Sequence, residues 1–262
     1  MNRRILDFLR RPGARFFEPS DGGSTSWTFS QAESAEMLPS SSIWISQFGV
    51  TTGSFGVSVW SSSFGGINTV LTAPVPGDEP AYELTGGVGG RPLIVPDGLG
   101  DTLEGTFTKG SVFDNGELGF VGRAGTGEGT AARVFGYHAS STQRWSVLRH
   151  TPPTEMNTSR NDGSSVTTND TTNRDGEIGH WTAITDETNL RILLNGVEMA
   201  NAGSGQAVSF ADGGTIKFFE YAGAATNRST SAAQAGYIGP RLSDEQRTYL
   251  RALLTYYTGV DC

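Results

Sequence analysis

The chain has 262 residues, a formal net charge of −8 and 36 glycines. It contains no run of about 18 apolar residues, which excludes a membrane-spanning helix, and its only cysteine, Cys262, excludes an internal disulfide. The fold must therefore depend on an apolar core, and the length suits one large β domain or two small ones.

Charge is divided unevenly between the start of the chain and the rest. Residues 1–15 carry five arginines and one acidic residue, a net charge of +4, which leaves −12 on the remainder. Apolar residues recur at helical spacing within Asn2–Arg11, which predicts an amphipathic helix too short to be stable without a partner. We therefore expect residues 1–37 to be a basic arm with a connector, and residues 38–262 to be the folded domain. The residues expected to dock the arm are Arg3, Arg4, Ile5, Phe8, Leu9, Arg10 and Arg11.

The sequence shows neither an export signal nor a nucleic-acid surface. Arginines stand on both sides of the short apolar stretch near the N-terminus, and no long apolar core or small-residue cleavage site follows, as a secretory signal would require. A body with a charge of −12 repels phosphate backbones. We therefore expect no direct role in nucleic-acid binding and no membrane association.

From Leu38 onward, short apolar runs alternate with turn signals rich in glycine, proline, serine and asparagine. Many short strands at close spacing are typical of a β-sandwich and not of alternating strands and helices. The predicted strands cover residues 43–45, 57–60, 93–95, 117–121, 133–138, 145–150, 181–185, 190–194, 208–210, 216–221 and 236–238.

The segment 154–179 is the longest one without apolar character. A loop of this length without structure is uncommon in a compact domain and is usually functional or mobile. The alternative is a polar hairpin at a sheet edge, and the sequence leaves both interpretations open.

The last third of the chain contains the clearest local signals. Asn195-Gly196 stands between apolar runs, which predicts a hairpin turn because both central residues need positive φ. A helix is predicted after Ser243, which can cap it together with Gln246, and Gly259 suits its end. One apolar stripe of this helix, made of Leu250, Leu253, Leu254 and Tyr257, is expected to lie on the sandwich.

A family resemblance follows from segments that occur in order along residues 38–262. The chain resembles the concanavalin A-like (laminin-G-like) jelly-roll domains found in many bacteriophage virion proteins and in bacterial surface proteins. The resemblance implies an all-β, antiparallel jelly-roll β-sandwich with a C-terminal helix and an N-terminal basic arm. The matching segments are Ser42–Ile45, Val59–Gly65, Glu79–Tyr82, Gly89–Leu103, Trp181–Ala183, the Asn195-Gly196 turn and the helix with its flanks, Leu242–Gly259.

The function that the resemblance implies first is a non-enzymatic structural protein of a phage virion: a capsid decoration, a head fibre or a tail component. Its partners would be other virion proteins, with a homo-oligomer inside a larger assembly and a glycan of the host surface as a further ligand. The protein would be made in the host cytoplasm and located in the virion. The alternatives are a bacterial lectin-like adhesion module and, third, a glycan hydrolase or lyase.

Three tryptophans in strand-like runs, Trp60, Trp145 and Trp181, have two interpretations. Large aromatic side chains in a sandwich are usually core residues. The functional alternative is that one or two of them line the concave sheet face and stack on a sugar ring.

Catalytic and metal-binding patterns are weak. A glycosidase needs two separated carboxylates, whereas the acidic groups here, Asp78-Glu79, Asp186-Glu187 and Asp244-Glu245, are adjacent in sequence. We therefore expect no enzyme and no cofactor. Calcium is an alternative because related domains sometimes bind it, and Asp97 and Asp101 would then be its ligands, although turn capping is the commoner role of aspartate there.

Overall fold

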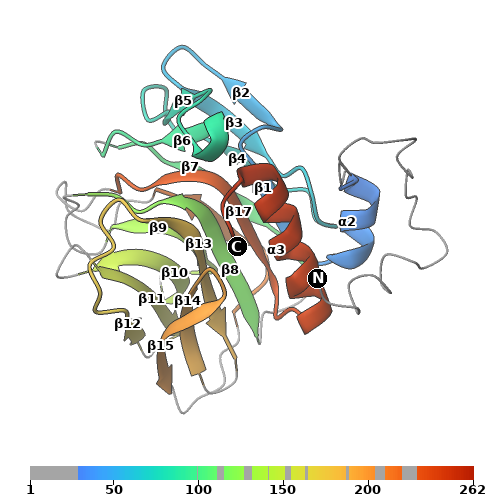
Figure 1. The fold of residues 1–262 in the computed structure, drawn as a ribbon, viewed down its shortest axis with the longest axis vertical. Helices are drawn as coiled ribbons and strands as arrows, with labels where there is room; N and C mark the ends of the chain where they lie inside the picture. The colour runs from blue at the N-terminus through green and yellow to red at the C-terminus, as the bar shows by residue number, and fades with distance from the viewer. Residues whose placement is uncertain are drawn as a thin grey trace, which may run out of the picture.

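The computed structural model describes residues 29–98, 100–110, 115–126, 132–140, 142–150, 155–162, 165–186, 189–203, 210–219 and 229–262. These residues form a β-sandwich of two stacked antiparallel sheets with helices on one side (Figure 1). The predicted fold class is confirmed. Within the described ranges, no helix is both long and apolar enough to cross a membrane.

The first sheet has eight strands, in the order β15-β14-β13-β8-β17-β6-β5, and β1 also pairs with β17. Its strands are β1 (Ser42–Ile45), β5 (Ala81–Glu83), β6 (Leu93–Val95), β8 (Gly116–Arg123), β13 (Ile178–Thr185), β14 (Asn189–Leu194), β15 (Val197–Gly203) and β17 (Ala232–Pro240). The long strands β8, β13 and β17 lie in its middle, where each is paired on both sides.

The second sheet has nine strands, in the order β12-β11-β10-β9-β16-β7-β4-β3-β2. Its strands are β2 (Val50–Thr52), β3 (Val57–Ser61), β4 (Val70–Thr72), β7 (Leu103–Phe107), β9 (Arg133–His138), β10 (Gln143–His150), β11 (Glu155–Asp162), β12 (Ser165–Asn169) and β16 (Gly214–Phe218). Most predicted strands are found near their expected places. The prediction 208–210 lies mostly outside the described residues, as does the end of 216–221.

The polar segment 154–179 contains an edge hairpin. Strands β11 and β12 pair with each other, and β12 is the last strand of the nine-stranded sheet. The hairpin alternative is therefore confirmed for the paired strands, residues 155–162 and 165–169. Its serines, threonines and asparagines fit an edge strand, because only one side of that strand pairs with a neighbour.

The helix α3 (Asp244–Thr258) closes the outer face of the eight-stranded sheet (Figure 1). The predicted caps are confirmed: Ser243 and Gln246 form a capping box, and Gly259 has a φ of 72°. The apolar stripe is also confirmed, since Leu250, Leu253 and Leu254 are buried against the outward side chains of the sheet. Burial of this stripe holds the helix in place.

The connector predicted before residue 38 is wrong for its last part, which forms the helix α2 (Gln31–Met37). The hydroxyl of Ser34 accepts a hydrogen bond from the amide of Gly65 at 3.0 Å. The Phe29 ring contacts Tyr249 of α3 edge-on, at 5.4 Å between centroids. Residues 29–37 are therefore packed on the domain, and the sequence hid this because short Ser- and Glu-rich helices resemble loops.

Candidate functional site

The three tryptophans proposed as glycan-stacking residues lie in the core. Trp60 and Trp181 have no exposed surface and Trp145 is 1% exposed, all within the cluster between the sheets. The Trp60 indole donates to the carbonyl of Ile45 at 3.3 Å, and its ring centroid is 5.2 Å from that of Phe218. A ring without an exposed face cannot stack on a sugar, so the core interpretation replaces the functional one.

Asp97 and Asp101 lie close together in the turn after β6. A carboxylate oxygen of Asp101 accepts the backbone amide of Asp97 at 2.7 Å, and Asp101 is buried. Burial, followed by the nearby negative charge of Asp97, raises the pKa of Asp101 to about 6. Calcium takes about six to eight oxygen ligands, and in the described part of the chain no three His, Cys, Asp or Glu side chains gather around a common point. The pair fits the turn-capping alternative better than a calcium site.

Replacing Asp101 with Asn is expected to stabilise the protein at neutral pH but not near pH 4. The folded-state pKa of about 6 exceeds the ordinary 3.8, so the charged carboxyl weakens the fold as the pH rises through this window. Asn keeps an oxygen for the Asp97 amide and never ionises. Urea unfolding at about pH 4, 5, 6 and 7 should show that the variant exceeds the wild type in free energy of unfolding by an amount that grows with pH to about 1–2 kcal/mol. A gain that is equal at all four pH values would contradict this account.

One residue of each acidic pair has a structural role in the described part of the chain. Glu79 accepts the amides of Phe55 and Gly56, each at 3.0 Å. Asp186 accepts the amide of Asn189 at 3.0 Å, which closes the turn before β14. Asp244 begins α3, where a negative charge is favoured by the helix dipole. The seven residues of the docking arm lie outside the described residues.

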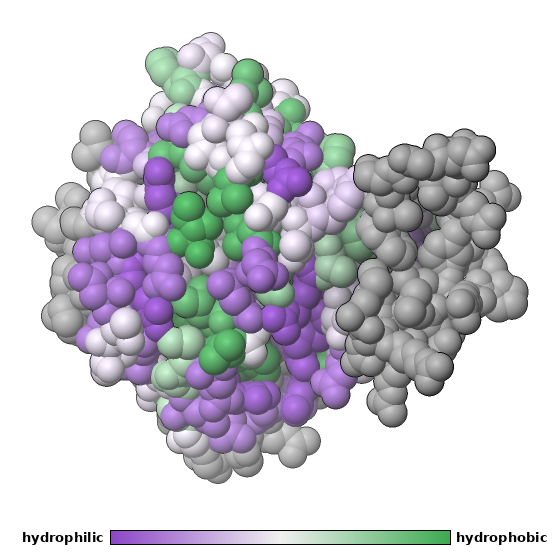
Figure 2. All heavy atoms as spheres, viewed as in Figure 1, coloured by the Kyte–Doolittle hydropathy of each residue, from purple (hydrophilic) through white to green (hydrophobic). Residues whose placement is uncertain are grey.

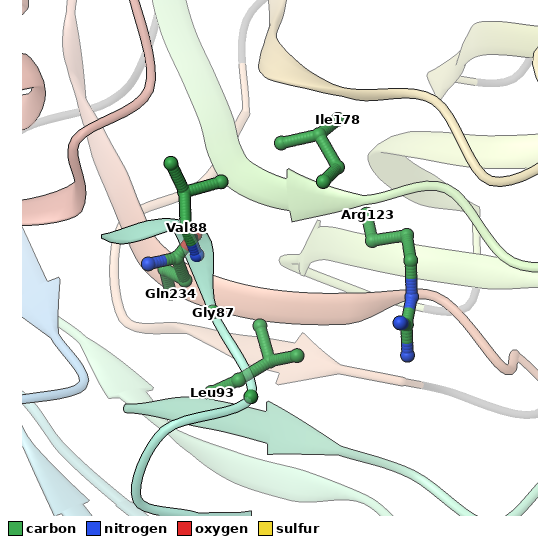
Figure 3. A pocket seen from close by; sticks show the side chains of 7 residues that line it. Gly87, Val88, Leu93, Arg123, Ile178 and Gln234 are labelled. Carbon is green, nitrogen blue, oxygen red and sulfur yellow. Dashed lines mark hydrogen bonds between the residues drawn. The ribbon is translucent and has the colours of Figure 1, made fainter. Parts of the chain in front are cut away.

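Two hollows stand out on the described surface. The smaller one, about 110 Å³, lies beside the 3₁₀ turn η1 (Val88–Gly90). Figure 3 shows Val88 and Ile178 on opposite sides of it, Leu93 at one end and Arg123 extending away. This volume is below the range of about 300–1,000 Å³ typical of ligand sites. The Gln234 side chain beside it already bonds the amide of Val88 and the carbonyl of Thr258.

The larger hollow, about 470 Å³, lies between α3 and the outer faces of β13 and β14. We call it the arginine cleft. One side is formed by residues spaced three and four apart on α3, which therefore share a helix face. The lining also includes two buried apolar side chains, those of Ile184 and Leu193. The lining residues are Ile184, Arg191, Leu193, Gly196, Arg241, Asp244, Arg247, Thr248 and Arg251. Figure 2 shows the same side of the molecule as Figure 1, with hydrophobic residues near the middle of the face and hydrophilic residues flanking them.

Three of the four arginines of the cleft are ion-paired. Arg247 binds the buried carboxylate of Glu117 through two nitrogens, and also Asp244 at 3.2 Å. Asp186 is shared by Arg191 at 3.2 Å and Arg241 at 3.7 Å. These contacts fix the guanidinium groups without filling the hollow.

Arg251 differs from the other three arginines. Its Nη2 donates to the carbonyl of Asn195 at 2.7 Å, and no carboxylate of the described residues lies within 4.0 Å of it. The Asn195-Gly196 turn that supplies this carbonyl has φ values of 50° and 76°, as the predicted hairpin requires. A Cβ at Gly196 would stand 2.3 Å from Nη2 of Arg251, so the guanidinium lies directly on this glycine.

The side chains next to Arg251 on β13 are uncharged. His180 is fully buried, and burial, followed by the positive charge of Arg251, lowers its pKa to about 3. Its Nε2 lies 3.1 Å from the hydroxyl of Thr182, which accepts the hydroxyl of Tyr237 at 3.0 Å. Burial likewise raises the pKa of Tyr237 well above its ordinary value. This network therefore adds no charge near Arg251 at neutral pH.

Sequence reasoning missed the arginine cleft. Its four arginines come from β14, from the link after β17 and from two places on α3, and no sequence spacing connects these segments. The one local signal was the series Asp244, Arg247, Thr248 and Arg251 at helical spacing.

No family model matches the chain, and no curated protein matches it in sequence. Solved structures do match in fold. One is domain 4 of a GH43 extracellular arabinanase from Geobacillus stearothermophilus, in complex with arabinotriose, with 12% identity and a TM-score of 0.54 over 80% of this chain and 96% of that domain.

Two further matches come from botulinum neurotoxins. The type C toxin, whose cell entry depends on two ganglioside molecules, shares 13% identity and a TM-score of 0.53 over 82% of this chain and 51% of its own. The serotype D ligand-binding domain, in complex with N-acetylneuraminic acid, shares 11% identity and a TM-score of 0.53, over 84% of this chain and 52% of its own.

The chain has a jelly-roll β-sandwich fold in common with these proteins. At such identities the likeness extends to the fold alone, and the chain spans about half of each toxin chain. The predicted place in a phage virion stays a prediction.

Proposed function

We propose that the chain is a carbohydrate-binding β-sandwich that acts without catalysis, and that the arginine cleft is its binding site. This corresponds to the lectin-like alternative and not to the first expectation, a virion structural protein with glycan binding as a further property. The observation that carries the proposal is a ligand-sized hollow of about 470 Å³ whose lining includes four arginines. The fold adds support, because the arabinanase domain that matches over 96% of its length was solved with arabinotriose.

The lining of the cleft suits a sugar. Sugar hydroxyls accept hydrogen bonds from guanidinium N–H groups, which are fixed here by their ion pairs. The apolar lining residues Ile184 and Leu193 are buried, so the arginines and Thr248 are expected to make the main contacts with the sugar. Glu117 and Asp186 are held by arginines, so neither is placed as the free acid and base that hydrolysis requires.

The test is titration of the purified chain with a panel of neutral and acidic bacterial oligosaccharides. We expect binding of at least one class, weakened about tenfold or more by Arg191→Gln, since a charge-assisted hydrogen bond is lost. Lys217→Gln removes the same charge from the nine-stranded sheet, where Lys217 pairs with Glu104, and should leave affinity unchanged. Failure to bind any member, or equal losses in both variants, would refute the proposal. Turnover of any bound glycan would show instead that the chain is an enzyme.

A virion structural role is a second candidate, supported by the charge difference between residues 1–15, at +4, and the rest, at −12. A basic arm can order on an acidic assembly surface. Deleting residues 1–15 should then remove the protein from purified phage particles, and its retention in the particles would contradict docking through the arm.

A further inference from the structure

We infer that the ligand of the arginine cleft is an acidic sugar, and that its carboxylate is bound by Arg251. The inference rests on the proposed carbohydrate-binding function and narrows it to one chemical class.

Arg251 differs from the other arginines of the cleft in how its charge is balanced. Arg191, Arg241 and Arg247 each have a carboxylate partner, whereas Arg251 donates a hydrogen bond to a neutral carbonyl, that of Asn195. The neighbouring His180 is held uncharged by burial, so it neither adds to nor cancels this charge at neutral pH. Within the described part of the chain, Arg251 is therefore the cleft cation whose charge is not compensated.

Arg251 is positioned by its contacts with the turn between β14 and β15. Its guanidinium rests on Gly196 and donates through Nη2 to the carbonyl of Asn195, both in the β14–β15 turn. A positioned planar guanidinium binds a carboxylate with two parallel hydrogen bonds and loses little side-chain freedom in doing so. The partly buried setting also makes the interaction stronger than it would be in open water.

The rest of the cleft suits a ligand rich in hydroxyls. The lining includes the hydroxyl of Thr248 beside the arginines, whereas the apolar side chains of Ile184 and Leu193 are buried. The chain outside residues 1–15 carries a net charge of −12, which disfavours the binding of long polyanions such as nucleic acids. A small ligand with one carboxylate and a sugar ring meets both conditions.

The experiment compares acids with their uncharged esters. Wild-type protein is titrated with a galacturonic acid trisaccharide and with N-acetylneuraminic acid, each beside its methyl ester, which keeps the ring and removes the charge. We expect at least one acid to bind about 10- to 100-fold more tightly than its ester. Added salt should weaken the binding of the acid and leave the binding of the ester unchanged.

Variants then locate the carboxylate. Arg251→Gln should reduce the affinity for the acid to that for the ester, and Arg251→Lys should recover part of it, because it restores the charge but not the planar fork. Lys217→Gln is the matched control and should change nothing. Should Arg251→Gln fail to fold, the ester comparison and Arg251→Lys still decide the question.

The outcomes separate this inference from the proposed function. Equal binding of acid and ester, or binding of neutral oligosaccharides alone, would contradict the inference that the ligand is an acidic sugar. The proposal that the chain binds carbohydrate would still be supported. If Arg251→Gln still binds the acid more tightly than the ester by the same factor, the carboxylate is bound elsewhere. This result would overturn the assignment of the carboxylate to Arg251. Competition by inorganic phosphate as strong as that by the acid would replace the carboxylate with a phosphate group. No binding of any glycan removes both conclusions.

Discussion

Replacing Arg247 with Met is expected to lower the free energy of unfolding by about 3 kcal/mol or more. Glu117 is 1% exposed and lies under α3, where Arg247 binds it through two nitrogens. The amide of Leu242 also donates to it at 3.3 Å, which is not enough to replace the lost charge. A buried carboxylate without its cation is costly because it is neither hydrated nor paired. Urea unfolding at neutral pH measures the loss.

The double variant Glu117→Met with Arg247→Met separates the cost of an unpaired Glu117 carboxylate from the other effects of losing the Arg247 side chain. Removing both charges leaves apolar side chains of similar length, and we expect its stability to return to within about 1–2 kcal/mol of the wild type. Arg241→Met, at a more exposed arginine, should cost less than about 1 kcal/mol. If the double variant is less stable than Arg247→Met alone, the pair is not a buried ion pair in the sense proposed here.

Replacing Trp60 with Ala is expected to destabilise the protein by about 3–5 kcal/mol and to leave glycan affinity unchanged in the folded protein. Its indole has no exposed surface and packs beside Phe218 in the core. The substitution removes this buried surface and leaves a cavity, and β3 lies in the sheet opposite the arginine cleft. Thermal unfolding measures the first effect, and titration well below the unfolding temperature measures the second.

Phe55→Ala provides the control for Trp60→Ala. Phe55 is 70% exposed, so its truncation should change stability by less than about 0.5 kcal/mol. If the folded Trp60→Ala variant lost glycan binding, Trp60 would be part of the binding site. That result would contradict its assignment to the core.

Local elements were predicted well because their causes are local. The Asn195-Gly196 turn follows from positive φ at two neighbouring residues, and the ends of α3 follow from Ser243, Gln246 and Gly259. The sandwich itself followed from the number of short strands and from the family resemblance. The helix α2 was missed because its contacts are with residues far away in the sequence, Gly65 through Ser34 and Gln246 of α3 through the carbonyl of Met37.

The sequence by itself determined the fold class and the strand-rich organisation, through the many short strands and the family resemblance along the chain. It also determined the hairpin turn and the capped helix, since each of these two depends on residues within one short segment. Only the tertiary structure decided that the tryptophans are core residues, because strand alternation gives two faces and does not say which one is covered. Only the tertiary structure also assembled the arginine cleft, because Arg191, Arg241 and Arg251 come together through the pairing of β13 with β14 and the docking of α3 on the sheet.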